Sequence, residues 1–466
     1  MDHMGVLDAS FVHLERNGIP LHVGSLMIFE GPAPTHDELK EALESRLFLV
    51  PRYRQKVRSV PLNLSTPAWV DDPHFNIDYH VRHTAVPQPG DGEQLKRLFS
   101  RIMGQPLDFR RPVWEAWLVE GLEGGRWALM NKAHHCMIDG MSGADITSLL
   151  LSLSPDAQAP DGPQWQPKQE PSTRDVMVDG VTHAVKHPIQ RAGHIVDLVR
   201  SVPKATAIRS AAGVKGLVPT LKVVPPNRFG LNGPISPHRR WTWVHGSLDD
   251  VKSVRRATGA TVNDVILAAI TLGFREFLTA RGEDVSEGTV TTMVPVSTRP
   301  AGQTGQHDNQ VAAMFADLPV GIEDPIEVLA EISRQLADLK VSGGAESVNL
   351  MTKAGDFVPS TLLALGVRAS ARATQRSVST VTTNIPGPQV PLYFLGHQML
   401  ENFPFIPLAM DVRITIGIFS YNGEVTMGIT GDYEAMPDIE DLAAAIEESL
   451  TLLTERATAL LAASTD

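Results

Sequence analysis

The chain has 466 residues, of which 42% are hydrophobic and 20% are charged. These fractions are ordinary for a globular protein with a large core, so they exclude a disordered, collagen-like or disulfide-framework protein. Lys and Arg number 41, and Asp and Glu number 53, which leaves a formal net charge of −12. A chain this acidic is not, as a whole, a nucleic-acid binder. Cys136 is the only cysteine, which excludes an intrachain disulfide and a cysteine zinc site and suits a reducing compartment.

The N-terminal residues show no secretory signal, because Asp2, Asp8 and Glu15 interrupt any apolar stretch and no basic segment precedes one. The longest apolar run, residues 265–274, is too short for the roughly 20 residues that span a bilayer. We therefore expect a protein that is soluble or bound to a membrane surface.

Capping residues, hydrophobic periodicity and Gly or Pro stops predict five elements before residue 153. These are two helices (36–50 and 92–103), two strands (115–122 and 127–133) and a third helix (141–153). Thr35 and Glu38 form the capping-box pattern T-x-x-E at the first helix, which should end before Pro51. The second strand runs directly into two adjacent histidines.

Residues 154–172 are rich in Pro, Gln, Asp and Gly and read as a linker. Residues 174–240 contain eleven Lys or Arg and three Asp or Glu, a local balance of +8. This segment is either a connection between domains with a solvated basic side or a surface for anionic lipid headgroups or a phosphorylated ligand.

The remaining chain again mixes strands and helices. The predicted strands are 241–244, 289–296, 310–318, 378–383, 393–397, 414–419 and 425–429, and the predicted helices are 248–257, 261–280, 325–340 and 438 to the C-terminus. Without strict βαβ alternation, the order indicates an α+β protein and not a doubly wound nucleotide fold. The sequence contains no GxGxxG or GxxxxGK[ST] pattern, so NAD and ATP chemistry lack their usual support.

The sequence HHCMIDG, residues 134–140, carries the candidate chemistry. Asp139 stands four residues beyond the second histidine, His135, so an imidazole and a carboxylate share one loop. Imidazole has an ordinary pKa of about 6.5, so at neutral pH one ring nitrogen is free to take a proton from an alcohol or amine. Gly140 permits a tight turn. General-base catalysis and a pair of structural histidines both stay open.

Three other chemistries match the residues less well. Metal ligation by His134, His135 and Asp139 is disfavoured, because adjacent side chains of an extended segment diverge. A serine nucleophile elbow, G-x-S-x-G, is absent; the nearest string, GMSGA, has alanine in place of the second glycine. Cys136 is poorly placed as a nucleophile, because neighbouring residues in a strand face opposite sides.

This motif resembles the HHxxxDG signature of the bacterial wax ester synthase/diacylglycerol acyltransferase family, which belongs to a superfamily that includes the peptide-synthetase condensation domains. All four fixed places match. Other strings similar to the family follow in order along nearly the whole chain: LDASF (7–11), LHVGSLMIFEGP (21–32), PRYRQ (51–55), WVDDPHFNIDYHVRH (69–83), RPVWEAWLVEGL (111–122), NGPISPHRRW (232–241), ATVNDVILA (260–268), PVSTR (295–299), TNIPGP (383–388) and FSYNG (419–423). The chain departs from the family at Val113 in its PLW element, at Cys136 in place of Ala, and at Asp308 in place of Gly.

The resemblance implies a fold of two chloramphenicol-acetyltransferase-like domains, fused as a pseudo-dimer with an active-site tunnel between them. On this basis residues 1–153 form the N-terminal acyltransferase domain with HHxxxDG, residues 154–237 the linker and basic helical connection, and residues 238–466 the C-terminal acyltransferase-like domain.

The resemblance also implies roles for single residues. His135 is the general base that takes the proton of an acceptor hydroxyl and returns it to the departing CoA thiolate, without an acyl-enzyme. His134 orients the loop, and Asp139 and Gly140 shape it, with Arg299 as a partner of the carboxylate.

Asn263 matches the family's ND element, which implies a hydrogen bond to the base or to the developing oxyanion. The neighbouring Asp264 belongs to the same element, but we expect it to be a capping group that pairs with Thr261 at a helix start. Trp114 is expected to be a core anchor beside the tunnel.

Three functions follow from these patterns. The first is an O-acyltransferase that moves a fatty acyl group from acyl-CoA to diacylglycerol, to a long-chain alcohol, or to both. The alternatives are an amide-forming condensation enzyme that uses carrier-protein thioesters, and a non-catalytic lipid-binding protein. We expect no metal and no cofactor, since acyl-CoA is a substrate, and no nucleic-acid partner. The expected location is cytoplasmic, peripherally associated with the inner face of the membrane or with lipid bodies.

Overall fold

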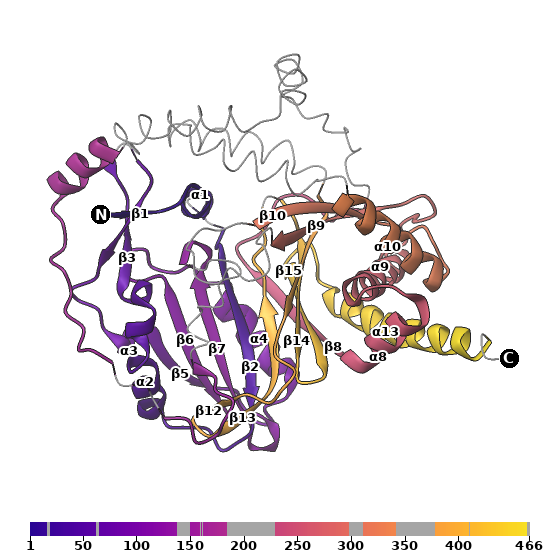
Figure 1. Ribbon diagram of the computed structural model, residues 1–466, viewed down its shortest axis with the longest axis horizontal. Coiled ribbons are helices and arrows are strands. Elements are labelled where there is room, and N and C mark those ends of the chain that lie inside the picture. Colours follow the sequence, from indigo (N-terminus) through magenta and orange to yellow (C-terminus); the bar gives the residue numbers. More distant parts are fainter. Residues whose placement is uncertain are drawn as a thin grey trace, which may run out of the picture.

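A computed structural model describes residues 1–15, 19–61, 65–137, 150–158, 160, 162–183, 229–297, 311–341, 378–409 and 411–463. Two six-stranded sheets dominate this part of the chain (Figure 1). Most of the predicted helix 141–153 (residues 141–149) and most of the basic segment (residues 184–228) lie outside the described residues.

The first sheet has the strand order β12-β13-β2-β7-β6-β5. Its strands are Tyr393–Phe394, His397–Phe405, His22–Phe29, Trp127–His134, Trp114–Glu120 and Val81–Ala85, in that order. Around it lie α1 (Val6–Glu15), α2 (His36–Glu44), α3 (Ile77–His80), α4 (Gly92–Met103) and a small sheet of β1 (Asp2–His3), β4 (Ala68–Asp71) and β3 (Gln55–Arg58). The two predicted strands 115–122 and 127–133 correspond to β6 and β7, which pair antiparallel around residues 123–125.

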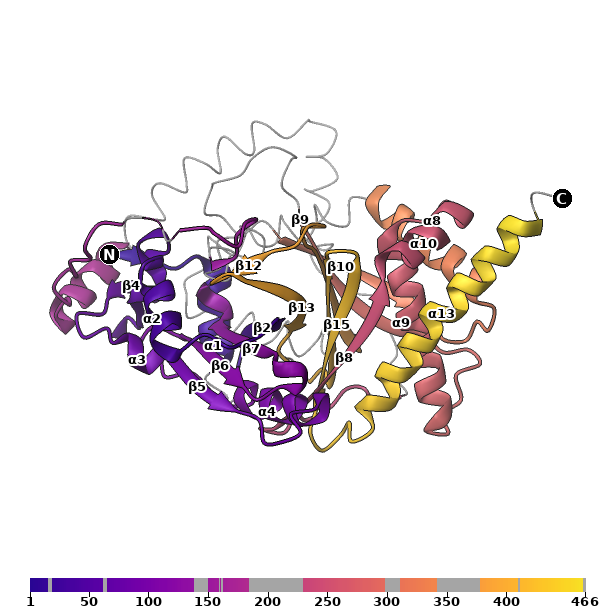
Figure 2. The same ribbon diagram turned by 90° about the horizontal axis from the view of Figure 1, so that it is seen from below.

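The second sheet has the order β10-β9-β11-β14-β15-β8. Its strands are Val311–Leu318, Val290–Ser297, Thr380–Pro386, Ile414–Tyr421, Glu424–Asp432 and Arg239–Ser247. The helices α8 (Leu248–Thr258), α9 (Val262–Ala280), α10 (Pro325–Val341) and α13 (Ile439–Ala463) cover one face of it (Figures 1 and 2).

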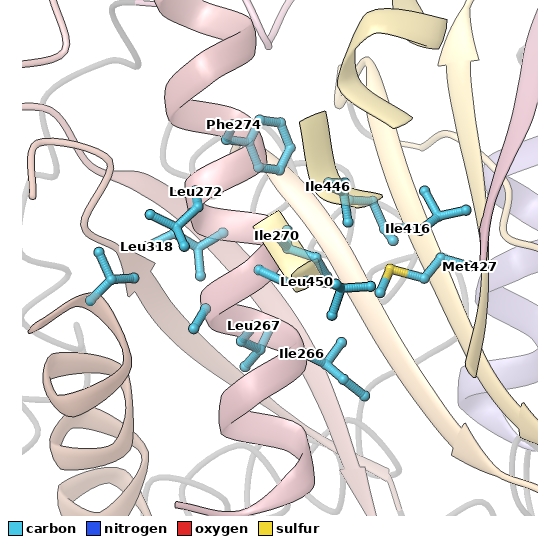
Figure 3. Packing of buried hydrophobic residues seen from close by; sticks show 14 of the residues in the cluster. Ile266, Leu267, Ile270, Leu272, Phe274, Leu318, Ile416, Met427, Ile446 and Leu450 are labelled. Carbon is cyan, nitrogen blue, oxygen red and sulfur yellow. The ribbon is translucent and has the colours of Figure 1, made fainter. Parts of the chain in front are cut away.

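Helix α9 is the centre of the largest hydrophobic cluster. From Val265 to Phe274 every residue of this helix is buried, as its continuous apolar sequence predicts. Ile270 of α9 faces Ile416 of β14 and Ile446 of α13 (Figure 3). The cluster ties the helical layer to the sheet.

Strand β13 connects the two sheets, although its residues come from the C-terminal half of the chain. It pairs with β2 in the first sheet, and its Pro404 carbonyl rests against Gly428 of β15, where a Cβ would lie only 1.7 Å from the oxygen. Thr426 Oγ1 donates to the Asn402 carbonyl at 2.6 Å. The central position of β13 is visible in Figure 2.

Most elements predicted from sequence are present, and two of the predicted elements are interrupted in the structure. Helix α2 begins at the Thr35–Glu38 capping box but ends at Glu44, and a separate 3-10 turn, Leu47–Leu49, follows it. The predicted strand 393–397 is interrupted by a left-handed turn at Leu395 (φ 50°) and Gly396 (φ 83°), after which β13 runs to Phe405. No single helix in the described ranges is long and apolar enough to cross a membrane.

Candidate active site

The candidate site is the corner where β7 ends. His134 is the last residue of β7 and lies opposite His22 of β2. The His134 N–H donates to the Val113 carbonyl at 2.9 Å, and the His135 N–H donates to the Leu21 carbonyl at 3.0 Å. The backbone of both histidines is therefore hydrogen-bonded to neighbouring segments.

The imidazole of His134 is fully buried and uses both of its nitrogens inside the protein. The Cys136 N–H donates to His134 Nδ1 at 3.1 Å, so Nδ1 carries no proton. The ring proton therefore lies on Nε2, which donates to Glu15 Oε2 at 2.7 Å. This arrangement leaves no ring nitrogen of His134 free for a substrate.

The imidazole of His135 lies in a different environment. It stacks on the ring of Phe11 in α1, with 4.0 Å between ring centroids and 23° between planes. The His135 side chain is partly exposed to solvent. Nδ1 is buried and has no hydrogen-bond partner among the described residues. Burial, together with the neighbouring His134, lowers the pKa of His135 to about 4. The ring is therefore neutral at pH 7 and able to accept a proton.

Cys136 is a buried thiol, and it is the next residue along. Burial, with the carboxylates of Asp8 and Glu15, raises the pKa of the thiol well above its ordinary value. A thiol that stays protonated is a weak nucleophile, which argues against Cys136 as the reacting group.

A second buried polar group lies behind the corner, where α4 ends. Lys132 of β7 is 1% exposed and donates through Nζ to the Ile102 carbonyl at 3.0 Å and to the Gln105 carbonyl. His22 Nε2 donates to the Met103 carbonyl. The Ile102 and Met103 carbonyls belong to the last turn of α4, where helix carbonyls lack a full set of intrahelical partners, and Gln105 follows the helix. Burial lowers the pKa of Lys132 to about 8.

Asn263 and Asp264 stand at the start of α9. Asp264 closes a capping box with Thr261, since Thr261 N–H donates to Asp264 Oδ2 at 2.9 Å and Asp264 N–H donates to Thr261 Oγ1 at 3.2 Å. Asn263 Oδ1 accepts a hydrogen bond from Asn384 Nδ2 at 3.2 Å. The strings ATVNDVILA and TNIPGP, distant in sequence, therefore meet at this point.

Several predicted site residues lie outside the described residues. These are Asp139, Gly140 and Arg299, together with Asp308. Within the described ranges, no group of three or more His, Cys, Asp or Glu could hold a metal ion.

Comparison with known proteins identifies the family. A model described as wax ester synthase/diacylglycerol acyltransferase catalytic domain matches residues 4–266, and one described as WS/DGAT C-terminal domain matches residues 307–454. A probable diacylglycerol O-acyltransferase, tgs1, of Mycobacterium tuberculosis is 34% identical over 463 residues, which cover 97% of this chain and 96% of the relative. The chain belongs to the wax ester synthase/diacylglycerol acyltransferase family. It is an acyltransferase.

Solved structures support the fold assignment of this acyltransferase. A wax ester synthase/diacylglycerol acyltransferase from Marinobacter aquaeolei VT8 is similar with a TM-score of 0.69 and 24% identity, over 98% of this chain and 100% of that chain. The first condensation domain of the calcium-dependent antibiotic synthetase has a TM-score of 0.60 and 18% identity, over 98% and 96%. The α+β fold that the sequence predicted is therefore confirmed.

Two residues of this acyltransferase that contact the histidines were missed by the sequence reasoning. Phe11 and Glu15 are four residues apart on α1, so they share one face of the helix. A carboxylate at a helix C-terminus is unfavourable beside the macrodipole, so Glu15 signalled a partner elsewhere in the fold. Trp114, by contrast, is the core anchor that the sequence predicted: it is 1% exposed and donates to the Tyr53 carbonyl at 2.8 Å.

Proposed function

We propose that this acyltransferase moves a fatty acyl group from acyl-CoA to the hydroxyl of diacylglycerol, of a long-chain alcohol, or of both, with His135 as general base. The observation that carries the proposal is the neutral, partly exposed imidazole of His135 at the end of β7. The acceptor class rests on the relatives, whose names describe diacylglycerol O-acyltransferases.

In this mechanism an acceptor hydroxyl gives its proton to His135 while its oxygen forms a bond to the thioester carbonyl carbon. The carbon–sulfur bond then breaks, and the imidazolium returns the proton to the CoA thiolate. The ring only takes up and returns one proton, and the acyl group passes directly from sulfur to the acceptor oxygen, so no acyl-enzyme is required. Because Nδ1 is buried, Nε2 is the nitrogen that a hydroxyl reaches, and the ring proton lies on Nδ1.

The remaining site residues take supporting roles in the same proposal. Asp139 and Gly140 shape the turn after His135, and Arg299 pairs with the Asp139 carboxylate. Asn263 donates its amide hydrogens to the base or to the oxyanion, which its position supports because its Oδ1 is already used by Asn384. The substrates meet in a tunnel between the two halves of the chain.

We also place the enzyme at a lipid surface, on the cytoplasmic side of the membrane or on lipid bodies. The acceptors are lipids, and the segment 174–240 has a local charge balance of +8 in a chain of net charge −12. Basic segments bind anionic headgroups, and this attraction weakens with salt.

The test is turnover of radiolabelled palmitoyl-CoA with diacylglycerol and with hexadecanol in parallel. His135→Ala should abolish product in both, whereas His245→Ala, which removes an exposed histidine from β8, should keep wild-type turnover. Full activity of His135→Ala would refute the assignment of the base. No product from folded wild-type enzyme would favour a carrier-protein donor or a binding role.

A further inference from the structure

Glu15 connects the two histidines to the rest of the fold. Its side chain is 8% exposed, and a single oxygen, Oε2, accepts two hydrogen bonds. One comes from His134 Nε2 at 2.7 Å and the other from the Leu21 N–H at 2.8 Å. These donors lie on opposite sides of the corner, because Leu21 leads into β2 and His134 ends β7.

The second bond extends the connection to His135. The Leu21 carbonyl accepts from the His135 N–H at 3.0 Å. Leu21 therefore binds Glu15 through its N–H and the backbone of the proposed base through its carbonyl. Helix α1 thus contacts the corner twice: Phe11 supports the imidazole of His135, and Glu15 holds the backbone and the neighbouring ring.

The Glu15 carboxylate also determines the tautomer of His134. With Nδ1 occupied by the Cys136 N–H, the Nε2 proton needs an acceptor in a buried site, and Glu15 Oε2 supplies it. A buried carboxylate needs hydrogen-bond donors to replace the water it loses. Here the Leu21 N–H and His134 Nε2 supply them, and Lys132 is an electrostatic neighbour of the same carboxylate.

We propose that Glu15 is a positioning residue for acyl transfer: through His134 and Leu21 it holds the backbone that carries His135, and so orients the base. This inference rests on the proposed function, in which His135 accepts the proton. Glu15 itself touches no substrate.

The experiment compares three variants of the full chain. Glu15→Gln retains an oxygen that accepts both bonds, Glu15→Asp retains the charge but withdraws the oxygen, and Glu15→Leu removes both. Because a misplacement of about 1 Å costs up to about 100-fold in rate, we expect the Asp and Leu variants to lower kcat by about 10- to 100-fold. The KM for palmitoyl-CoA should stay within about threefold, and Glu15→Gln should stay close to wild-type kcat.

Asp432→Leu is the matched control. It removes a buried carboxylate, 1% exposed, from β15 of the second sheet, where Asp432 accepts from the Ser236 and Ala435 N–H groups. This variant should lose stability but keep its kcat per folded molecule. All rates are measured below the unfolding midpoint of each variant. If Glu15→Leu does not fold, Glu15→Asp and Glu15→Gln still test whether Glu15 positions the base.

Wild-type kcat in Glu15→Asp, or a loss no larger than that of Asp432→Leu, would overturn the positioning role. A Glu15→Gln variant as slow as Glu15→Leu would overturn the hydrogen-bond clamp, because charge alone would then carry the effect. His135→Ala distinguishes the role of His135 from that of Glu15. If His135→Ala stays active, His135 is not the base and the proposed function fails. If His135→Ala is inactive while Glu15→Asp keeps wild-type kcat, only the positioning role of Glu15 fails.

Discussion

The low pKa of His135 predicts an unusual pH dependence, and Phe11 offers a way to change it. Phe11 covers one face of the imidazole at 4.0 Å, and burial holds the pKa at about 4. Phe11→Ala admits water to that face, so the charged ring is better solvated and the pKa rises toward its ordinary value. Phe11→Leu keeps an apolar cover and is the matched control.

The magnitude follows from the two pKa values. The difference between about 6.5 in the unfolded chain and about 4 in the folded protein corresponds to roughly 3 kcal/mol of preference for the neutral ring. Between these values the unfolded chain binds more protons at His135 than the folded protein does. The contribution of His135 to stability is therefore complete above about pH 6.5 and is lost as the pH falls toward 4.

The assay is the pH profile of kcat/KM, measured by the formation of radiolabelled product. The acid limb reports the free base, so in the wild type it should lie near pH 4, with activity nearly constant from pH 6 to pH 8. Phe11→Ala should move the limb upward by about one unit or more, and Phe11→Leu should leave it in place. A wild-type limb near pH 6.5, or no movement in Phe11→Ala, would show that burial beneath Phe11 does not hold the pKa of His135 low.

Three further predictions concern stability. Because the folded protein disfavours the charged amine of Lys132, the unfolding free energy of the wild type should rise by roughly 3 kcal/mol between about pH 8 and pH 10.5. Lys132→Met should abolish this rise, which urea unfolding across the same pH range measures. Asp264→Ala should lower the unfolding free energy by about 1–2 kcal/mol, because it removes the capping box with Thr261 and the hydrogen bond from Ser333 Oγ; kcat per folded molecule should stay unchanged, and a large kcat loss would contradict a purely structural role. Gly387→Ala should cost about 1–3 kcal/mol in a thermal melt, because its Cβ would lie 2.4 Å from the Ser420 carbonyl oxygen; an unchanged melting temperature would contradict this.

Local features were predictable because neighbouring residues decide them. The capping boxes at Thr35 and Thr261 and the stop of α4 at Gly104 appear as predicted. The tight turn between β14 and β15 likewise has Asn422 (φ 46°) and Gly423 (φ 90°) in the left-handed region that these two residue types tolerate.

The missed features depend on contacts between distant parts of the chain. Strand β13 contains Asn402 and Pro404, which disfavour a strand locally, yet β2 supplies its hydrogen-bond partners and the glycine of β15 leaves room for it. Phe11 shows no local sign of its contact with His135, because the two meet only when α1 folds over the end of β7.

The family, the α+β class, the capped helix starts and the position of the paired histidines can be read from the amino-acid sequence, since each follows from short-range patterns or from strings in a fixed order. The contact of His134 with Glu15, 119 residues away, and the burial that lowers the pKa of His135 arise only on folding. Hydrogen-bond partners and desolvation are properties of the packed environment, which elements remote in sequence create together.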